Sequence, residues 1–387
     1  MSRSHILAGK RFLFFLPGLE LGGAERQALH LARHLKSLGC DVQVWGNSGP
    51  GLAADQCNET GIPWAIQPST WPCRKRHLPR FVWRVIRTIQ ALRRASPDVI
   101  LAYCARPCIS SGLAWRWSPA KMFIWGQRDC YLYNDAVVRF AYRCASAVIC
   151  NAAHEIDYLH RTVGEMHAPI FVVHNGIELA PSEKSRAEWR AELSICESTP
   201  VATMVANFQF QKDHPTLLHA WRKLLKTCSE GQPRPRLLLA GAPLESFDNV
   251  HQLAINLGLL DTVNFLGQVR DIAGLLAASD IGVLSSPNEG LPNAVIEYMS
   301  SGLPVVATDL PANREILGDD PQQPFCKPGD PDNLAAQLQA LLNDPDLRHK
   351  LGKRNRQRAL VEFSIDVMCR KTVDIIADLL YASPRGG

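Results

Sequence analysis

Residues 280–301 read DIGVLSSPNEGLPNAVIEYMSS, and this stretch decides the fold that we predict. The short apolar run at 281–284, between polar residues, is typical of a strand buried in a parallel sheet. A loop containing Gly290 follows, and residues 293–300 have a helical spacing that ends before Gly302. The stretch therefore predicts a strand, a loop and a helix. Loops of this kind, at the carboxyl edge of an open α/β sheet, bind ligands.

Two carboxylates belong to this stretch, Glu289 in the loop and Glu297 one turn inside the helix. The start of a helix supplies N–H donors for an anion, whereas a carboxylate can only accept hydrogen bonds. A nucleotide sugar would suit both, because it has a phosphate and also hydroxyls on its ribose and on its transferred ring. The spacing alone fits equally well a loop carboxylate and a helix carboxylate that both face water.

The segment EGLPNAVIE at 289–297, followed by SGLPVVATD at 301–309, closely resembles the signature of glycosyltransferase family 4. Members of that family are retaining enzymes of the GT-B fold that use nucleotide sugars. The resemblance implies that Glu289 holds hydroxyls of the transferred sugar and that Glu297 holds the ribose. It also implies donor contacts from the intervening backbone, namely Gly290, Leu291, Pro292, Asn293 and Ala294.

The length and the apolar pattern predict two domains. A chain of 387 residues is too long for one ordinary core. Short apolar runs alternate with amphipathic segments in both halves, which predicts an α/β fold with two doubly wound, Rossmann-like sheets. We expect an acceptor-binding domain at 1–177 and a nucleotide-sugar-binding domain at 178–363, facing each other across a cleft as the GT-B resemblance implies. The resemblance also implies that a final helix within 364–387 crosses back to the first domain.

A glycine-bearing turn, PGLELGGAER at 17–26, joins the first predicted strand to the first helix. It is not G-x-G-x-x-G, which argues against a dinucleotide-binding oxidoreductase. Gly22 and Gly23 let the backbone approach a ligand closely at the helix start. Family 4 has a Gly-Gly-Ala-Glu turn here, beside the donor diphosphate and the acceptor, so the resemblance implies donor binding by both glycines. A plain tight turn is the alternative.

A second motif, VANFQFQKDH at 205–214, ends the first strand predicted for the second domain. It resembles the family segment in which an Arg and, five residues later, a Lys hold the donor's phosphates. Lys212 matches, but Asn207 stands where many members have Arg, so phosphate binding must depend more on Lys212 and on backbone amides. A cation is needed because transfer leaves a nucleoside diphosphate with growing negative charge. A solvated Lys at a strand end is the alternative.

The segment FLGQVRD at 265–271 resembles the family's lining for the nucleotide base. The resemblance implies backbone contacts to the donor from Gly267 and Val269. A turn between a strand and a helix, with no ligand, explains the same residues.

Metal binding is not expected. The D-x-D patterns at 330–332 and 344–346 contain Pro and precede predicted helices. They therefore indicate helix capping and not a divalent-ion site. We expect that the protein uses no cofactor, since a nucleotide-sugar donor is a substrate.

The acceptor side departs from the family pattern. Many members place a His after the strand predicted at 122–125, facing the reacting sugar, whereas this chain reads IWGQRDCYLY at 124–133. Arg128 could contact the acceptor or the diphosphate, and Asp129 could take the acceptor's proton. Arg106, in a loop that is expected to face the cleft, is a second candidate. A surface turn formed by Arg128 and Asp129 is the alternative.

Positive charge is concentrated in the first half of the chain. Through residue 181, Lys and Arg outnumber Asp and Glu by 21 to 12, and the remainder has 21 against 25. Much of the excess lies in the segment 74–94, RKRHLPRFVWRVIRTIQALRR, where a helix is predicted near 78–95. Its apolar stripe consists of Leu78, Phe81, Val82, Val85, Ile89 and Leu92, and its off-stripe arginines are Arg80, Arg84, Arg87 and Arg94.

Two interpretations of the 74–94 segment remain open. It could cover its own sheet and expose a basic face, or it could attach to an anionic membrane surface for a lipid-linked acceptor, aided by Trp71 and Trp83. We expect no nucleic-acid partner, because no recognition motif accompanies the charge. No apolar run has the length of a membrane span or an export signal. We therefore expect a cytoplasmic protein, either free or peripheral on the inner face of the membrane.

These inferences predict a hexosyltransferase-type enzyme that moves a sugar from a nucleotide-sugar donor to a saccharide or lipid-linked saccharide. Surface polysaccharide, lipopolysaccharide or glycan biosynthesis would need such a reaction. Glu289, Lys212 and Arg128 are the predicted catalytic residues. The alternatives are a glycoside hydrolase, which also uses two carboxylates, a nucleotide-sugar epimerase of the same fold, and a non-catalytic protein that binds sugar nucleotides.

Overall fold

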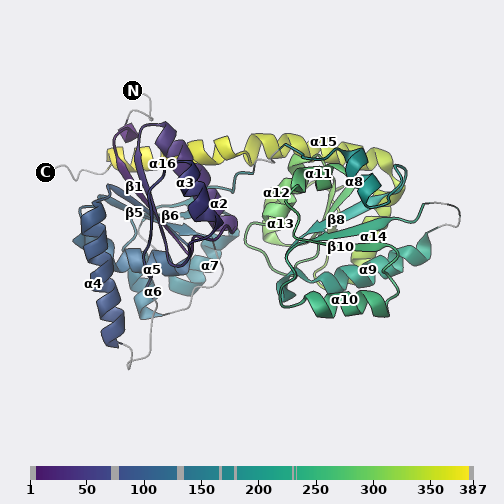
Figure 1. Cartoon of the computed structure of the whole chain (residues 1–387), viewed down its shortest axis with the longest axis horizontal. Helices are drawn as coiled ribbons and strands as arrows, with labels where there is room; N and C mark the ends of the chain where they lie inside the picture. Colours follow the sequence, from purple (N-terminus) through teal and green to yellow (C-terminus); the bar gives the residue numbers. More distant parts are fainter. Residues whose placement is uncertain are drawn as a thin grey trace. The chain divides into compact units, whose positions relative to one another are not determined.

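The computed structural model describes residues 6–70, 78–128, 135–164, 168–177, 181–228, 231 and 233–382. The chain forms two compact units (Figure 1). Unit 1 comprises Met1–Gly176 and Ile365–Gly387, and unit 2 comprises Ile177–Ser364. The C-terminal segment thus belongs to the same unit as the N-terminal half of the chain, although unit 2 separates them in the sequence.

Unit 1 contains a parallel seven-stranded sheet with the strand order β3-β2-β1-β4-β5-β6-β7. Most of its strands are almost wholly apolar, because helices cover both faces and side chains of either orientation must be buried. The strands are β1 (Arg11–Leu16), β2 (Asp41–Gly46), β3 (Trp64–Ile66), β4 (Val99–Tyr103), β5 (Met122–Gln127), β6 (Ala147–Cys150) and β7 (Ile170–Val172).

Alternate residues of β1 enter two cores on opposite faces of this sheet. Phe12 and Phe14 pack with α2, α3 and α16, whereas Leu13 and Phe15 pack in the core that α4, α5, α6 and α7 cover (Figure 1). The last helix, α16, therefore completes one face of unit 1. The helices are α2 (Gly23–Ser37), α3 (Leu52–Glu59), α4 (Leu78–Ala95), α5 (Ala105–Ala114), α6 (Ala136–Arg143), α7 (His154–Val163) and α16 (Ile365–Ala382).

Unit 2 contains a parallel six-stranded sheet with the strand order β10-β9-β8-β11-β12-β13. All strands are parallel, but β9 and β10 lie on one side of β8, and β11 and β12 lie on the other, so the strand order reverses between β8 and β11. Open α/β sheets bind ligands at the carboxyl edge of such a switch point. The predicted fold with two doubly wound, Rossmann-like sheets is confirmed. The strands are β8 (Val201–Val205), β9 (Arg236–Ala240), β10 (Val263–Gly267), β11 (Ile281–Leu284), β12 (Val305–Thr308) and β13 (Phe325–Cys326).

Helices cover both faces of the unit 2 sheet, with α9 and α10 on one side and α8 and α11 on the other (Figure 1). The stretch at 280–301 forms β11, a loop and α12, as predicted. Asp330 and Asp344 of the D-x-D patterns accept hydrogen bonds from backbone N–H groups in α14 and α15, which confirms their capping role. The helices are α8 (Arg186–Glu192), α9 (His214–Thr227), α10 (Phe247–Asn256), α11 (Ile272–Ala277), α12 (Asn293–Ser300), α13 (Pro311–Leu317), α14 (Pro331–Asn343) and α15 (Pro345–Glu362).

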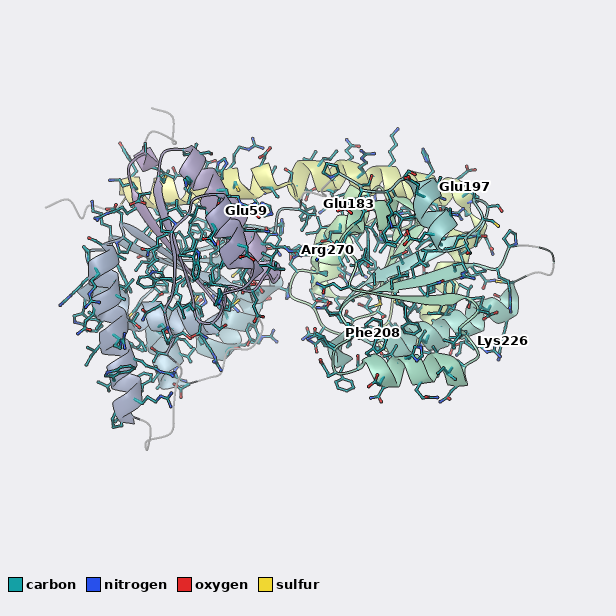
Figure 2. All side chains as sticks on the ribbon, viewed as in Figure 1. Glu59, Glu183, Glu197, Phe208, Lys226 and Arg270 are labelled. Atoms are coloured by element: carbon teal, nitrogen blue, oxygen red, sulfur yellow. The ribbon has the colours of Figure 1, made fainter. Side chains whose placement is uncertain are left out.

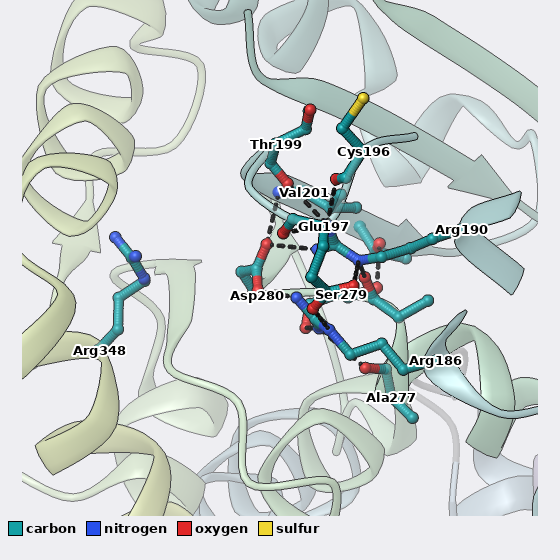
Figure 3. Close-up of polar contacts among 12 residues, drawn as sticks. Arg186, Arg190, Cys196, Glu197, Thr199, Val201, Ala277, Ser279, Asp280 and Arg348 are labelled. Carbon is teal, nitrogen blue, oxygen red and sulfur yellow. Dashed lines mark hydrogen bonds and ion pairs between the residues drawn. The ribbon is translucent and has the colours of Figure 1, made fainter. Parts of the chain in front are cut away.

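A buried arginine cluster closes the amino edge of the unit 2 sheet (Figure 3). Arg190 of α8 is only 2% exposed and donates to the carbonyl oxygens of Cys196, Glu197, Thr199 and Ala278. Its Nη2 also donates to Asp280 Oδ2 over 2.9 Å, and the same carboxylate oxygen accepts from the N–H of Val201. The cluster therefore ties α8 to the first residue of β8 and to the residue before β11.

Helix α4 differs from the predicted apolar stripe. Leu92 is buried and Phe81, Val85 and Ile89 are half-buried, but Leu78 and Val82 are exposed to solvent. Trp83 and Ile86 are exposed next to them, so α4 has an inward apolar face and a second, outward apolar face. The sequence pattern placed both sets of apolar residues on one stripe, because both sets recur at helical spacing. Residues 74–77 and Trp71 lie outside the described part of the chain.

Candidate active site

Two predicted residues meet at the carboxyl edge of the unit 2 sheet. Lys212 ends a 3₁₀ turn, η3 (Phe210–Lys212), which follows β8, and Glu289 lies in the loop between β11 and α12. Lys212 Nζ lies 2.6 Å from Glu289 Oε1, and the two side chains are 23% and 10% exposed. The ion pair therefore joins the loops that follow the two strands at the switch point.

The loop after Glu289 leads directly into α12, which carries Glu297 one turn inside. Leu291 and Pro292 are buried, whereas Gly290, Asn293, Ala294 and Glu297 are half-buried. Pro292 is the residue before the helix, and its side chain makes no capping hydrogen bond. No acidic residue lies in the first turn of α12, so the backbone N–H groups at this end are suited to an anion.

Asn207 and the predicted base-binding segment lie at the carboxyl ends of β8 and β10. Asn207 Oδ1 accepts a hydrogen bond from the N–H of Ala242, so its side chain supports the loop after β9. Gly267 has a φ of +64°, a conformation that favours glycine. The side chain of Val269 packs against a buried apolar cluster of unit 2. Asn207 thus adds no positive charge beside Lys212.

His214 adjoins this site and was not singled out from the sequence. It is 1% exposed, and its ring stacks on the buried ring of Phe208 with centroids 4.5 Å apart. Figure 2 labels Phe208 within unit 2. Burial, together with the charge of Lys212, lowers the pKa of His214 to about 4. The imidazole is therefore neutral at neutral pH, and Lys212 has no second cation at this position. The apolar spacing of α9 could have indicated that His214 faces the core.

In unit 1, the side chain of Arg128 is fixed at the carboxyl end of β5. Its Nη1 donates to Asn175 Oδ1 over 2.7 Å, and its guanidinium lies 5.4 Å from the centroid of the Tyr103 ring. Burial raises the pKa of Tyr103 to about 12, so the phenol remains protonated. Arg106 is exposed on α5, so the predicted loop is in fact the start of a helix. Asp129 lies outside the described residues.

The glycine turn at the start of α2 brings a carboxylate to the helix end. Gly22 precedes the helix and, like Gly23, is exposed. A Cβ atom on Gly22 would lie 2.6 Å from Glu25 Oε2, so the glycine makes room for that carboxylate. Burial raises the pKa of Glu25. The sequence prediction considered only the glycines, whereas the structure adds an acidic group that any ligand at this turn would meet.

Two searches of the described residues gave no site. No group of three or more His, Cys, Asp or Glu side chains in this part of the chain is arranged to hold a metal ion. None of the described helices combines the length and the apolar character that crossing a bilayer requires.

Comparisons with known proteins identify the family. The family model described as Glycosyltransferase Family 4 matches residues 21–181, and the one described as Glycosyl transferases group 1 matches residues 185–358. The chain belongs to glycosyltransferase family 4. It is 26% identical to the lipopolysaccharide core biosynthesis glycosyltransferase LpsE of Rhizobium meliloti, over 92% of this chain and 96% of that protein. The N-acetyl-alpha-D-glucosaminyl L-malate synthase of Bacillus anthracis is 27% identical over 65% of this chain and 64% of that protein.

Solved structures share the fold of this family 4 chain. A glycosyltransferase from Rickettsia africae superimposes with a TM-score of 0.82 and 20% identity, covering 97% of this chain and 100% of the other. HepE from Anabaena, solved with UDP and glucose, gives a TM-score of 0.80 with 19% identity, over 95% of this chain and 99% of the other. At these identities the likeness shows the fold alone, and it agrees with the predicted GT-B class.

Proposed function

We propose that this family 4 protein is a retaining glycosyltransferase that uses a nucleotide-sugar donor and a saccharide or lipid-linked saccharide acceptor. The Lys212–Glu289 ion pair, at the carboxyl edge of the unit 2 sheet and within the family motif, is the observation that carries the proposal. The relation to LpsE supports a role in lipopolysaccharide or other surface glycan synthesis. A uridine nucleotide is the first donor to test, because HepE was solved with UDP-glucose.

Each residue of the pair has a role that its chemistry permits. Lys212 would neutralise the donor diphosphate, whose charge grows as the sugar leaves. Glu289 would accept hydrogen bonds from hydroxyls of the transferred sugar, and Glu297 would accept from the ribose. Lys212 donates a hydrogen bond directly to Glu289. Donor binding would replace this single contact with a phosphate for the cation and hydroxyls for the carboxylate.

Retention at the anomeric carbon is part of the proposal. The acceptor hydroxyl would attack from the face that the diphosphate leaves, and no long-lived covalent intermediate on the enzyme is required. Arg128 would then hold an anionic group of the donor or acceptor, since Asn175 and Tyr103 fix its guanidinium. Transfer is proposed to need no metal, so chelation with EDTA should leave the rate unchanged.

The decisive experiment combines a donor screen with substitutions. Nucleotides and nucleotide sugars that bind only the folded chain should raise its melting temperature. Transfer should then fall by about 10²–10³ in Lys212→Ala and Glu289→Gln, because each loses a contact that strengthens in the transition state. Lys223→Ala is the matched control, since Lys223 forms a more exposed ion pair with Asp332. Wild-type rates in the two site variants would contradict the proposal.

The outward face of α4 supports a second part of the proposal, attachment to an anionic membrane surface. Leu78, Val82, Trp83 and Ile86 are 45–54% exposed on this face. The helix carries five arginines and no acidic residue, and the guanidinium of Arg87 lies 4.9 Å from the centroid of the Trp83 ring. Apolar side chains beside arginines are typical of helices that lie in the lipid interface.

Co-sedimentation with lipid vesicles tests the membrane contact. Vesicles with an anionic lipid should retain the protein, and neutral vesicles should retain less of it, because each arginine near an anionic surface adds about 1 kcal/mol. Trp83→Glu should weaken retention. Leu52→Glu is the control, since Leu52 is 62% exposed on α3, which covers the other face of the sheet. Equal retention on both vesicle types would argue against the contact.

The comparisons do not favour the alternative functions. An epimerase would convert the donor with no acceptor present, a hydrolase would release sugar from a simple glycoside, and a binding protein would turn over nothing. The same donor screen, followed by product analysis with and without a saccharide acceptor, separates these outcomes.

A further inference from the structure

The two strands at the switch point of unit 2 separate toward their carboxyl ends. Registered pairs join Ile281 of β11 to Ala202 of β8, and Gly282 to Thr203. On their other sides the strands stay paired for longer, β8 with β9 as far as Val205 and β11 with β12 as far as Leu284. The facing backbone groups beyond Thr203 and Gly282 therefore need partners other than the neighbouring strand.

The phenol of Tyr298 supplies the first of these partners. Tyr298 is fully buried on α12, and its hydroxyl accepts from the N–H of Val205 over 2.6 Å and donates to the carbonyl of Val283 over 3.3 Å. The ring lies over Gly282, where a Cβ atom would approach ring carbons to 2.5 Å. One side chain thus bridges β8 and β11 where their direct pairing has ended.

The hydroxyl of Ser285 supplies the second bridge. Ser285 directly follows β11, is fully buried, and donates to the carbonyls of Asp213 and Lys212 over 3.0 and 3.2 Å. Asp213 has a φ of +51°, in the left-handed region, so the chain turns sharply immediately after Lys212. The hydroxyl therefore holds the turn that carries Lys212 against the end of β11.

We infer that Ser285 and Tyr298 are positioning residues that set the separation of Lys212 and Glu289. Ser285 donates to the backbone carbonyl of Lys212 and lies only four residues before Glu289. One side chain therefore links the backbone segments that carry Lys212 and Glu289. The inference rests on the proposed function, because it assigns this geometry to donor binding. Open α/β sheets bind ligands at such a switch point, and the two hydroxyls would keep the separation of the strands constant.

The chain contains a matched control for each hydroxyl. Ser286 is as buried as Ser285, but its Oγ has no hydrogen-bond partner among the described residues. Tyr142 is a fully buried tyrosine of unit 1 whose hydroxyl likewise lacks a partner in the described part of the chain. Ser286→Ala and Tyr142→Phe therefore remove a buried hydroxyl without removing a bridge.

The test compares crystal structures and nucleotide affinity of the full chain. In Ser285→Ala, the Lys212 turn should move away from β11 and the Lys212–Glu289 contact should lengthen. Affinity for UDP should fall about tenfold, the value of one hydrogen bond that orients a charged group, whereas affinity for uridine should stay unchanged. Tyr298→Phe should behave in the same way, and both control variants should match the wild type.

Two outcomes would overturn the inference. One is a Ser285→Ala structure in which the Lys212–Glu289 contact is unchanged. The other is an equal loss of UDP and uridine affinity, which would indicate general loosening and not positioning of the diphosphate partner. If the wild-type protein binds no UDP, the proposed uridine donor is wrong, while the crystal structures still decide whether Ser285 positions Lys212.

Discussion

The two edges of the unit 2 sheet hold β8 and β11 together in opposite ways. At the amino edge, the guanidinium of Arg190 is almost fully buried and donates to four carbonyls and to Asp280 (Figure 3). At the carboxyl edge, Lys212 and Glu289 form a single ion pair with each other, and both side chains reach solvent. At the first edge each guanidinium nitrogen of Arg190 donates a hydrogen bond, whereas at the second edge the proposed donor could contact both charged groups.

This difference would let the sheet be stable at its amino edge and bind the proposed donor at its carboxyl edge. A buried guanidinium is stable only where each N–H finds an acceptor, so the amino edge can be expected to tolerate little change. A partly exposed ion pair contributes little to stability, so a ligand can replace it at low cost. In this view Arg190 and the hydroxyl bridges hold β8 and β11 in place, and the Lys212–Glu289 contact can be replaced by contacts with a ligand.

Removing the buried arginine should have the largest effect on stability. Arg190→Met removes the guanidinium that donates to four carbonyls and is one of the donors to Asp280, so we expect unfolding of unit 2 to become easier by about 3–5 kcal/mol. Native-state hydrogen exchange of the β8 and β11 amides measures this free energy locally. Below the unfolding transition, affinity for the donor should match the wild type.

Arg186 of the same helix gives the control for this prediction. Its side chain is 34% exposed, and it pairs with Glu197 and Asp280. Arg186→Met should cost about 1 kcal/mol or less, because solvent screens these contacts. Equal losses in the two variants would show that burial of Arg190 is not what stabilises the amino edge.

The buried imidazole near Lys212 should make stability depend on pH. The pKa of His214 is lowered from its ordinary 6.5 to about 4, so the unfolded chain binds a proton more readily than the folded chain. Stability should thus be complete above pH 6.5 and decline as the pH falls toward 4, with a loss of about 2 kcal/mol at pH 5 from this group.

His214→Phe isolates this contribution, because phenylalanine keeps a ring against Phe208 and cannot take up a proton. The fall in melting temperature between pH 7.5 and pH 5 should be smaller in the variant than in the wild type. The same pH dependence in both proteins would mean that His214 is not held neutral by burial.

Much of the fold could be predicted from the sequence, because parallel strands covered on both faces are continuous apolar runs. Most strands of both sheets follow this pattern, and β11 with the helix after it was recognised from 280–301 alone. Helices α3, α5, α7 and α8 were not predicted, since each has only 7–10 residues. Strand β13 has two residues, too few for a pattern, and it forms only by pairing with β12.

Two residues of the candidate site, Lys212 and Glu289, were singled out from the sequence, but the contacts that they make could not be predicted. Lys212 and Glu289 stand in recognisable motifs, and the structure brings them together. Ser285 contacts Lys212 across 73 positions of sequence, and no local pattern distinguishes it from Ser286. Such a difference depends on which way a buried side chain points at the end of a strand, and only the packing of β8 against β11 decides it.

The smallest expected effect is the coupling between Lys212 and Glu289, and it bears most directly on the comparison. Double-mutant cycles with Lys212→Ala and Glu289→Ala should give a coupling energy of about 1 kcal/mol or less, because both groups reach water. The corresponding cycle for Arg190→Ala and Asp280→Ala should give about 2–3 kcal/mol, because the Arg190 side chain is only 2% exposed. Chemical denaturation of the single and double variants measures both values. If the Lys212–Glu289 coupling equalled the Arg190–Asp280 coupling, a donor would have to break a strong structural contact, and the exchangeable pair that donor binding requires would not exist.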